Sequence, residues 1–187
     1  MARPRDPKID RKIAEAAAKI LMRDGYAALT LTAVAEAAGV GKPALYRRYP
    51  SKAELVFAAT VESSLKPGIP NTGSFAKDIR RSVAELVRTL KLAPRDILGE
   101  QIGRAMADPA FGAKMRARHI DLSLVRMMRV WDRAVARGEV DATIDGPRAL
   151  RDLSSAVIMQ VMLFRDQDEK HFQRELIARF LRSVAPR

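Results

Sequence analysis

The sequence contains no cysteine among its 187 residues. This absence excludes disulfide bonds, thiolate metal sites and cysteine nucleophiles, and it is typical of cytoplasmic proteins. Histidine occurs only twice, at His119 and His171, which lie far apart in the sequence. Asp121 is too close to His119 for the two side chains to ligate from one helix face, so we expect no metal site.

Long apolar runs are also missing, since no stretch of eighteen apolar residues occurs. We therefore expect no membrane-spanning helix. Residues 1–10 carry charges and no apolar segment, which argues against a secretory signal and predicts a cytoplasmic location.

Recognisable catalytic sets are absent as well. No serine–histidine–acid order and no paired carboxylates stand out, so we expect neither an enzyme nor a cofactor. The segment 39–42, GVGK, superficially resembles a phosphate-binding loop. The Walker spacing would need glycine in place of Glu36 and serine or threonine in place of Pro43, so this interpretation fails.

Acidic side chains are too few to balance the basic ones, and the net charge is +12. Such an excess indicates a polyanionic partner, most commonly nucleic acid. Residues 1–60 hold 11 basic and 6 acidic side chains, and residues 61–187 hold 23 and 16. Both parts are basic, so charge supports nucleic-acid binding without locating the site.

Helical periodicity dominates the chain, and alternation typical of strands is almost absent. We expect Asp6 and Pro7 to start the first helix and Gly25 to end it. Residues 66–73, KPGIPNTG, form the clearest linker signal. The later helices are predicted at 75–90, starting after a Ser74 cap, and at 94–107, 109–137, 146–164 and 168–184.

The segment from Thr30 to Lys52 is typical of two short helices joined by a glycine turn. Thr30 is positioned to cap a helix over 31–38, and a second helix over 42–49 stops at Pro50 before Ser51 caps the next. Gly39 can adopt a positive φ in the turn, and Gly41 can serve as an N-cap. This is the layout of a helix-turn-helix, whose second helix enters the major groove of DNA.

The second helix of this motif has a polar and aromatic side. Arg47 or Arg48 can pair bidentately with guanine, and Ala44 can touch a thymine methyl. Tyr46 and Lys52 suit phosphates, which fix the register without reading sequence. Further candidate contacts are Thr30, Thr32 and Lys42. The alternative is a solvated basic face on an ordinary helical bundle, but the order of caps, turn and proline stop favours DNA binding.

At these residues the chain resembles the TetR family of bacterial transcriptional regulators. The matching elements are Gly25-Tyr26, Leu29-Thr30, Val34-Ala35, Ala38-Gly39-Val40, Leu45-Tyr46 and Tyr49-Pro50-Ser51-Lys52. The resemblance implies DNA contacts at Thr30, Thr32, Lys42, Pro43, Ala44, Tyr46, Arg48 and Lys52. The chain departs from the family pattern at Gly41, where many relatives have serine or threonine, and at Tyr49, where phenylalanine is frequent.

The C-terminal part resembles the family in its helical plan and in the ARGEV segment near Arg137. The resemblance implies dimerisation through the last two helices and an effector pocket. Residues 150–164 are apolar on more than one face, which predicts burial on both sides, either against a partner or within one chain. The candidate dimer residues are Leu153, Val157, Val161, Phe172, Leu176 and Phe180.

A pocket for a small molecule is a further expectation for the C-terminal part. Methionine and aromatic side chains can line an adaptable apolar pocket, although helical methionines are more often plain core. Arg104 is a candidate for an anionic effector, with a surface salt bridge as the alternative. The candidate ligand-binding residues are Arg104, Met106, Met127, Met128, Trp131, Met159 and Phe164.

These observations predict an all-α protein with a helix-turn-helix domain at 1–50, a connecting helix at 51–66 and an effector-binding and dimerisation domain at 67–187. The expected function is that of a homodimeric transcriptional repressor, released from a palindromic operator by a small-molecule effector. A constitutive DNA-binding or architectural protein without an effector is the alternative, and a helical-bundle enzyme is a third possibility. Arg3 and Arg5 belong either to an arm in the minor groove or to a disordered tail.

Overall fold

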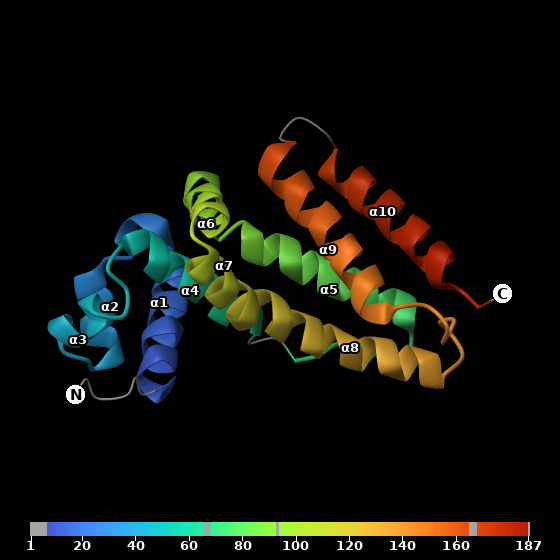
Figure 1. Ribbon diagram of the computed structural model, residues 1–187, viewed down its shortest axis with the longest axis horizontal. Helices are drawn as coiled ribbons and strands as arrows, with labels where there is room; N and C mark the ends of the chain where they lie inside the picture. Colours follow the sequence, from blue (N-terminus) through green and yellow to red (C-terminus); the bar gives the residue numbers. More distant parts are fainter. Residues whose placement is uncertain (1–6, 66–67, 93, 165–167, 187) are drawn as a thin grey trace. The chain divides into compact units, whose positions relative to one another are not determined.

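The computed structural model describes residues 7–65, 68–92, 94–164 and 168–186 (Figure 1). Asp6, Arg3, Arg5 and the first two residues of the expected linker lie outside these ranges, as does the side chain of His119. The described residues form helices and contain no strand, which confirms the predicted all-α class. None of their helices is long and apolar enough to cross a membrane.

The chain packs as two compact units. Unit 1 comprises Met1–Lys66 and Lys91–Ala107, and unit 2 comprises Pro67–Leu90 and Asp108–Arg187. The segment 91–107 therefore packs with the N-terminal helices, although the sequence-based division places it in the domain 67–187. The functions assigned to the predicted domains stay a prediction.

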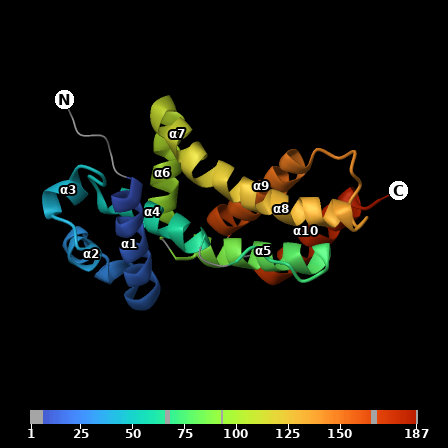
Figure 2. The ribbon, with the colours of Figure 1, turned by 90° about the horizontal axis from the view of Figure 1, so that it is seen from below.

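Unit 1 is built around its first helix, which packs mainly against α4 and also against α2 (Figure 2). The core contains Ile13 and Ala17 of the first helix and Leu55 and Val56 of the fourth, all fully buried. The sixth helix joins this unit by packing against α4. The helices are α1 (Pro7–Ala28), α2 (Leu31–Ala38), α3 (Lys42–Tyr46), α4 (Lys52–Leu65) and α6 (Arg95–Ala107).

Unit 2 is a separate helical bundle in which α9 packs against α5, α8 and α10. Its core centres on Phe75, whose ring meets Trp131 edge-on at 5.9 Å and lies 6.2 Å from Phe180. The helices are α5 (Phe75–Leu90), α7 (Pro109–Met115), α8 (Asp121–Ala136), α9 (Gly146–Leu163) and α10 (Glu169–Val184). The single helix predicted over 109–137 is interrupted by a π-helical segment, Arg116–Ile120, between α7 and α8.

Local sequence signals account for several helix ends. Gly25 has a φ of 81° and breaks the first helix as predicted, and Gly138 has a φ of 70° after α8. Both conformations are left-handed, where glycine alone escapes the steric penalty on a Cβ atom. Asp145 and Asp168 cap α9 and α10, because their carboxylates accept backbone N–H bonds from the first turn.

The start of α5 depends on a residue distant in the sequence. The Phe75 backbone N–H donates to Oε2 of Glu139 at 2.6 Å, so a carboxylate 64 residues away satisfies an N-terminal donor of the helix. Asp78 is fully buried, and its Oδ1 accepts the Thr72 N–H at 2.8 Å. These two carboxylates hold the segment before α5 to the body of unit 2.

Candidate nucleic-acid interface

The helix-turn-helix is formed by α2, α3 and the glycine turn between them. Thr30 Oγ1 accepts the Ala33 N–H at 3.1 Å, which confirms the predicted cap of α2. Gly39 ends α2 with a φ of 63°, and its N–H bonds back to carbonyls of that helix. Gly41 is the N-cap of α3 and offers no side-chain hydrogen bond there. The turn therefore depends on Gly39 for its left-handed backbone, whereas Gly41 has an extended backbone that other residues can also adopt.

Helix α3 buries one side and presents the other to solvent. Leu45 is fully buried, and Tyr49 just beyond the helix is also buried. Tyr46 is 49% exposed, and Lys42, Pro43 and Arg47 are exposed as well. Ala44 is half-buried at the edge of this surface. The prediction that this helix turns its cationic and phenolic side outward is therefore confirmed, although the helix ends at Tyr46 and not at Tyr49.

Arg48 differs from its predicted role. Its Nε lies 2.9 Å from Oδ1 of Asp10, and only 11% of the arginine side chain and 13% of the aspartate side chain are exposed. Its Nη1 also donates to the Ala44 carbonyl oxygen at 3.1 Å. Arg48 thus links α1 to the end of α3, and the expectation that it reads a base is corrected. The sequence shows an acidic residue at position 10 that could pair with an arginine. Helical periodicity does not indicate that its partner is Arg48, because Asp10 lies on α1 and Arg48 lies just beyond the end of α3.

Lys52 also has a partner inside unit 1. Its Nζ lies 4.0 Å from the centre of the Tyr26 ring, which is a cation–π contact between α4 and the end of α1. Ser51 caps α4 as predicted, because its Oγ accepts the Glu54 N–H at 3.2 Å. Lys52, which is half-buried as a residue, is therefore held at a defined place at the start of α4.

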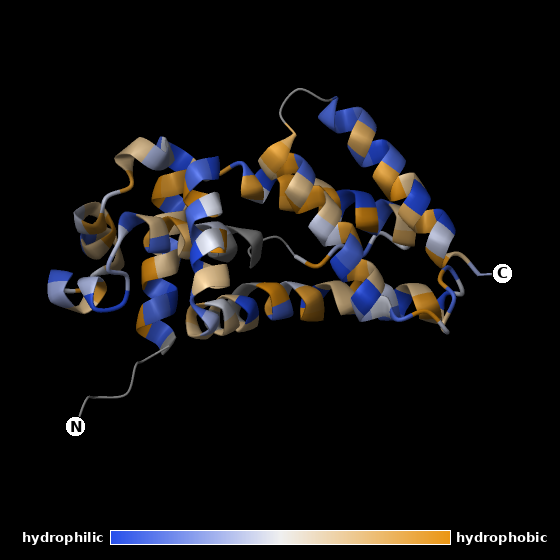
Figure 3. Cartoon of the chain, turned by 45° about the horizontal axis from the view of Figure 1, so that its top comes forward, coloured by the Kyte–Doolittle hydropathy of each residue, from blue (hydrophilic) through white to orange (hydrophobic). Residues whose placement is uncertain are grey.

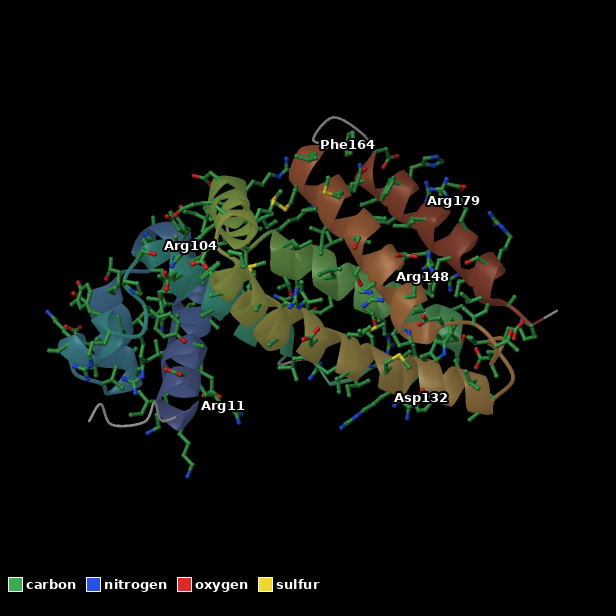
Figure 4. The ribbon with its side chains drawn as sticks, viewed as in Figure 1. Arg11, Arg104, Asp132, Arg148, Phe164 and Arg179 are labelled. Atoms are coloured by element: carbon green, nitrogen blue, oxygen red, sulfur yellow. The ribbon has the colours of Figure 1, made fainter. Side chains whose placement is uncertain are left out.

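The residues predicted to line an effector pocket are divided between the two units. Arg104 of α6 forms an ion pair with Glu54 of α4, so the salt-bridge alternative is the correct one. Met106 is 82% exposed on unit 1, and Trp131 is buried in the core of unit 2. Met127 and Met128 pack against that core, whereas Met159 and Phe164 are each 49% exposed. Figure 4 labels Arg104 and Phe164, which belong to different units.

The predicted dimer residues are mostly core residues of the single chain. Leu153, Val157, Val161 and Phe180 are buried among the helices of unit 2, and Phe172 and Leu176 are half-buried. Burial within one chain, the alternative given by the sequence, therefore explains the apolar pattern of these four residues. The exposed apolar side chains of α9 and its end are instead Met159, Leu163 and Phe164. Helical periodicity cannot distinguish these cases, because both faces of α9 are apolar near its C-terminus (Figure 3).

The residues that the structure describes contain no group of three or more histidine, cysteine or acidic side chains that could hold an ion. The site therefore consists of the capped helix α2, the glycine turn and the short helix α3, which projects exposed polar side chains. It defines a helix-turn-helix protein of the DNA-binding class.

Comparisons with known proteins agree with this class. The model of bacterial regulatory proteins of the tetR family matches residues 13–59. The model of the tetracyclin repressor-like C-terminal domain matches residues 69–181. The chain belongs to the TetR family of DNA-binding transcriptional regulators.

Individual relatives match over most of the chain. The HTH-type transcriptional regulator YdeS of Bacillus subtilis is 24% identical over 185 residues, covering 97% of this chain and 92% of the relative. The DNA-binding transcriptional repressor TetR of Mycobacteroides abscessus is 28% identical, covering 76% of this chain and 75% of that protein. The crystal structure of the TetR family transcription regulator SCO0332 has a TM-score of 0.74 at 24% identity, covering 96% of this chain and all of the other. By name, all three of these proteins are transcriptional regulators.

Proposed function

We propose that the protein is a homodimeric repressor that binds a palindromic operator and is released by a small-molecule effector. The observation that carries the DNA-binding part is the exposed side of α3, held outward because Leu45 anchors the opposite side. The relative from Mycobacteroides abscessus, which is named a repressor, supports the direction of regulation.

The proposed DNA contacts divide by chemistry. Arg47 is exposed at the end of α3 and suits a guanine edge, and Ala44 suits a thymine methyl. Lys42, Pro43 and Tyr46 complete the surface that enters the major groove. Thr30, Thr32 and Lys52 are assigned to phosphates, which position α3 without specifying sequence. Arg48 is left out because its guanidinium is paired with Asp10.

The proposed dimer forms through the outer side of α9 and α10. Leu163 is 62% exposed, and Met159 and Phe164 lie close to it in the sequence on the same end of α9. Exposed apolar side chains of this size favour burial against a second copy. A two-fold axis then requires half-sites separated by roughly 34–36 Å, which is one turn of DNA.

The proposed effector binds unit 2 and acts on unit 1 through α6. This helix packs in unit 1, yet the chain enters it from α5 and leaves it toward α7, both of which belong to unit 2. The Arg104–Glu54 ion pair joins α6 to α4, the helix that follows the helix-turn-helix. A change in unit 2 would therefore be transmitted through α6 to α4, which packs on α1 in the DNA-binding unit. The effector must bind the DNA-incompetent state more tightly, and DNA must weaken effector binding by the same factor.

A gel-shift titration against duplexes from upstream of neighbouring genes tests the proposal. We expect a palindrome to bind more tightly than a random duplex of equal length. Arg47→Ala should reduce this preference by about 1–3 kcal/mol, whereas Lys52→Ala should weaken both duplexes about equally. Equal affinity of the wild-type protein for palindrome and random duplex would refute sequence-specific regulation.

A constitutive DNA-binding protein without an effector is the second candidate. The dispersal of the predicted pocket residues over two units and over exposed positions favours it. Thermal shift separates the two candidates, because a ligand that binds only the folded protein raises its melting temperature. A library of small apolar compounds that produces no shift, and no release of DNA, would favour the constitutive binder.

A further inference from the structure

A basic groove lies on unit 1 between α1 and the C-terminal end of α2. Its volume is about 350 Å³. Alanine side chains make room in it, because Ala16 of α1 and Ala37 and Ala38 of α2 form part of its lining. The remaining lining residues are Lys12, Glu15, Lys19, Ile20 and Arg23. None of these residues belongs to the DNA contacts assigned above.

The cations of this groove belong to a row along α1. The row consists of Lys8, Lys12, Lys19 and Arg23. At 3.6 residues per turn these four positions fall within an arc of about 60°, and at 1.5 Å per residue the row is about 22 Å long. One helix therefore aligns positive charge over a length that spans several phosphates of a duplex.

The acids near this row are mostly neutralised by arginines. Glu15 lies 2.8 Å from Nε of Arg11, which Figure 4 labels on α1. Asp24 accepts two bonds of 2.8 Å from Arg23, so this arginine of the row is itself ion-paired and adds little net charge to it. Among the described residues, Lys12 and Lys19 have no ion-pair partner, and both are exposed. Glu36 of α2 is the remaining exposed acid nearby, and it leaves the groove with a net positive charge.

We propose that this groove binds the phosphodiester backbone of the same duplex that α3 reads, as a second, sequence-independent contact. The inference rests on DNA binding by α3. Ala38, in the wall of the groove, precedes Lys42 by four residues, so an extended chain separates them by at most about 14 Å. A duplex held at α3 is thus present at high effective concentration next to the groove, which favours it over a second DNA molecule.

The test compares Lys12→Gln/Lys19→Gln with a matched pair, Lys77→Gln/Lys170→Gln, in the full-length protein. The control pair removes the same charge from exposed positions of unit 2. Fluorescence anisotropy with a labelled random-sequence duplex of about 40 base pairs gives Kd between about 50 and 200 mM KCl. For Lys12→Gln/Lys19→Gln, the groove variant, we expect a weaker salt dependence. The slope of the logarithm of the observed association constant against the logarithm of the salt concentration should become less steep by about 1.8 for each groove that contacts the DNA. The control pair should leave that slope at the wild-type value.

Three results would overturn the inference. One is a wild-type slope in the groove variant, and another is an equal change in the control pair, which would indicate net charge alone. The third result concerns energy transfer between two differently labelled duplexes bound to one protein. If the groove variant loses this energy transfer, the groove binds a second DNA molecule and not the duplex held at α3. Tyr46→Ala is measured in parallel. If the Tyr46→Ala variant binds DNA as tightly as the wild type, this result counts against the α3 interface. The salt dependence of the Lys12→Gln/Lys19→Gln variant is interpreted separately.

Discussion

Replacing Arg48 should damage the stability of unit 1 and not the reading of DNA. Arg48 and Asp10 form an ion pair of 2.9 Å whose side chains are almost nine-tenths buried. Removing one member of a buried pair leaves the other charge without compensation, which costs about 3–5 kcal/mol. Because some exposure remains, we take the lower end of that range and expect Arg48→Ala to lower the free energy of unfolding by about 3 kcal/mol. In a protein of this size, that loss lowers Tm by about 6–12 °C.

Urea denaturation followed by circular dichroism measures this effect. Arg47→Ala is the matched control, because the neighbouring arginine is exposed and its loss should change stability by at most about 0.5 kcal/mol. A double-mutant cycle with Asp10→Asn adds a second check, since the double variant should cost less than the sum of the two single variants. An Arg48→Ala protein with wild-type stability and relaxed sequence preference would refute this reasoning and restore the base-reading role.

The other predictions concern helix starts and glycine positions. A Cβ atom on Gly146 would lie 2.6 Å from the Trp131 ring, so Gly146→Ala should destabilise the protein by about 1–3 kcal/mol. A Cβ atom on Gly99 would meet nothing within 4 Å beyond its chain neighbours and the nearby backbone of its own helix, so Gly99→Ala in α6 should stabilise the protein by about 0.5–1 kcal/mol. Thermal melting measures both variants, and equal shifts would contradict the packing argument. Desolvation raises the pKa of Glu139, but hydrogen bonds from Arg137 and the Phe75 N–H outweigh it, and the net pKa lies below its ordinary 4.5. Its contribution to stability is therefore complete above that value and is lost as the pH falls through the lowered pKa. Urea midpoints of Glu139→Gln should accordingly vary less across this acidic range than those of the wild type, and parallel pH profiles would refute the assignment.

Short-range chemistry explains why the helix-turn-helix could be predicted in detail. Thr30, Gly39 and Gly41 act on backbone groups within four residues, so their roles follow from residue type and spacing. The outward side of α3 could also be predicted, because Leu45 must face the core for so short a helix to be held. The observed α3 ends at Tyr46, and just beyond its end the side chains of Arg48 and Tyr49 contact Asp10 of α1.

The C-terminal part shows the limit of the same reasoning. Periodicity identified helices with apolar faces and left their partner open, and the dimer interface that the family resemblance implied included Leu153, Val157 and Val161, which pack inside unit 2. Likewise, methionine content indicated a pocket, although Met106 is largely exposed and Met127 packs on the core. An apolar face requires burial without naming the partner, because the hydrophobic effect is not directional.

The amino-acid sequence by itself determined the helical class, the glycine turn, the helix caps and the family, since each depends on residue type at short spacing. Tertiary structure alone decided which charges are paired, as with Arg48 and Asp10, Arg104 and Glu54, and the Glu139 cap on α5. It also decided that α6 packs with unit 1 and that α1 and α2 enclose a basic groove. The physical reason is that ion pairs and grooves depend on contacts between residues distant in the chain, which no local pattern encodes.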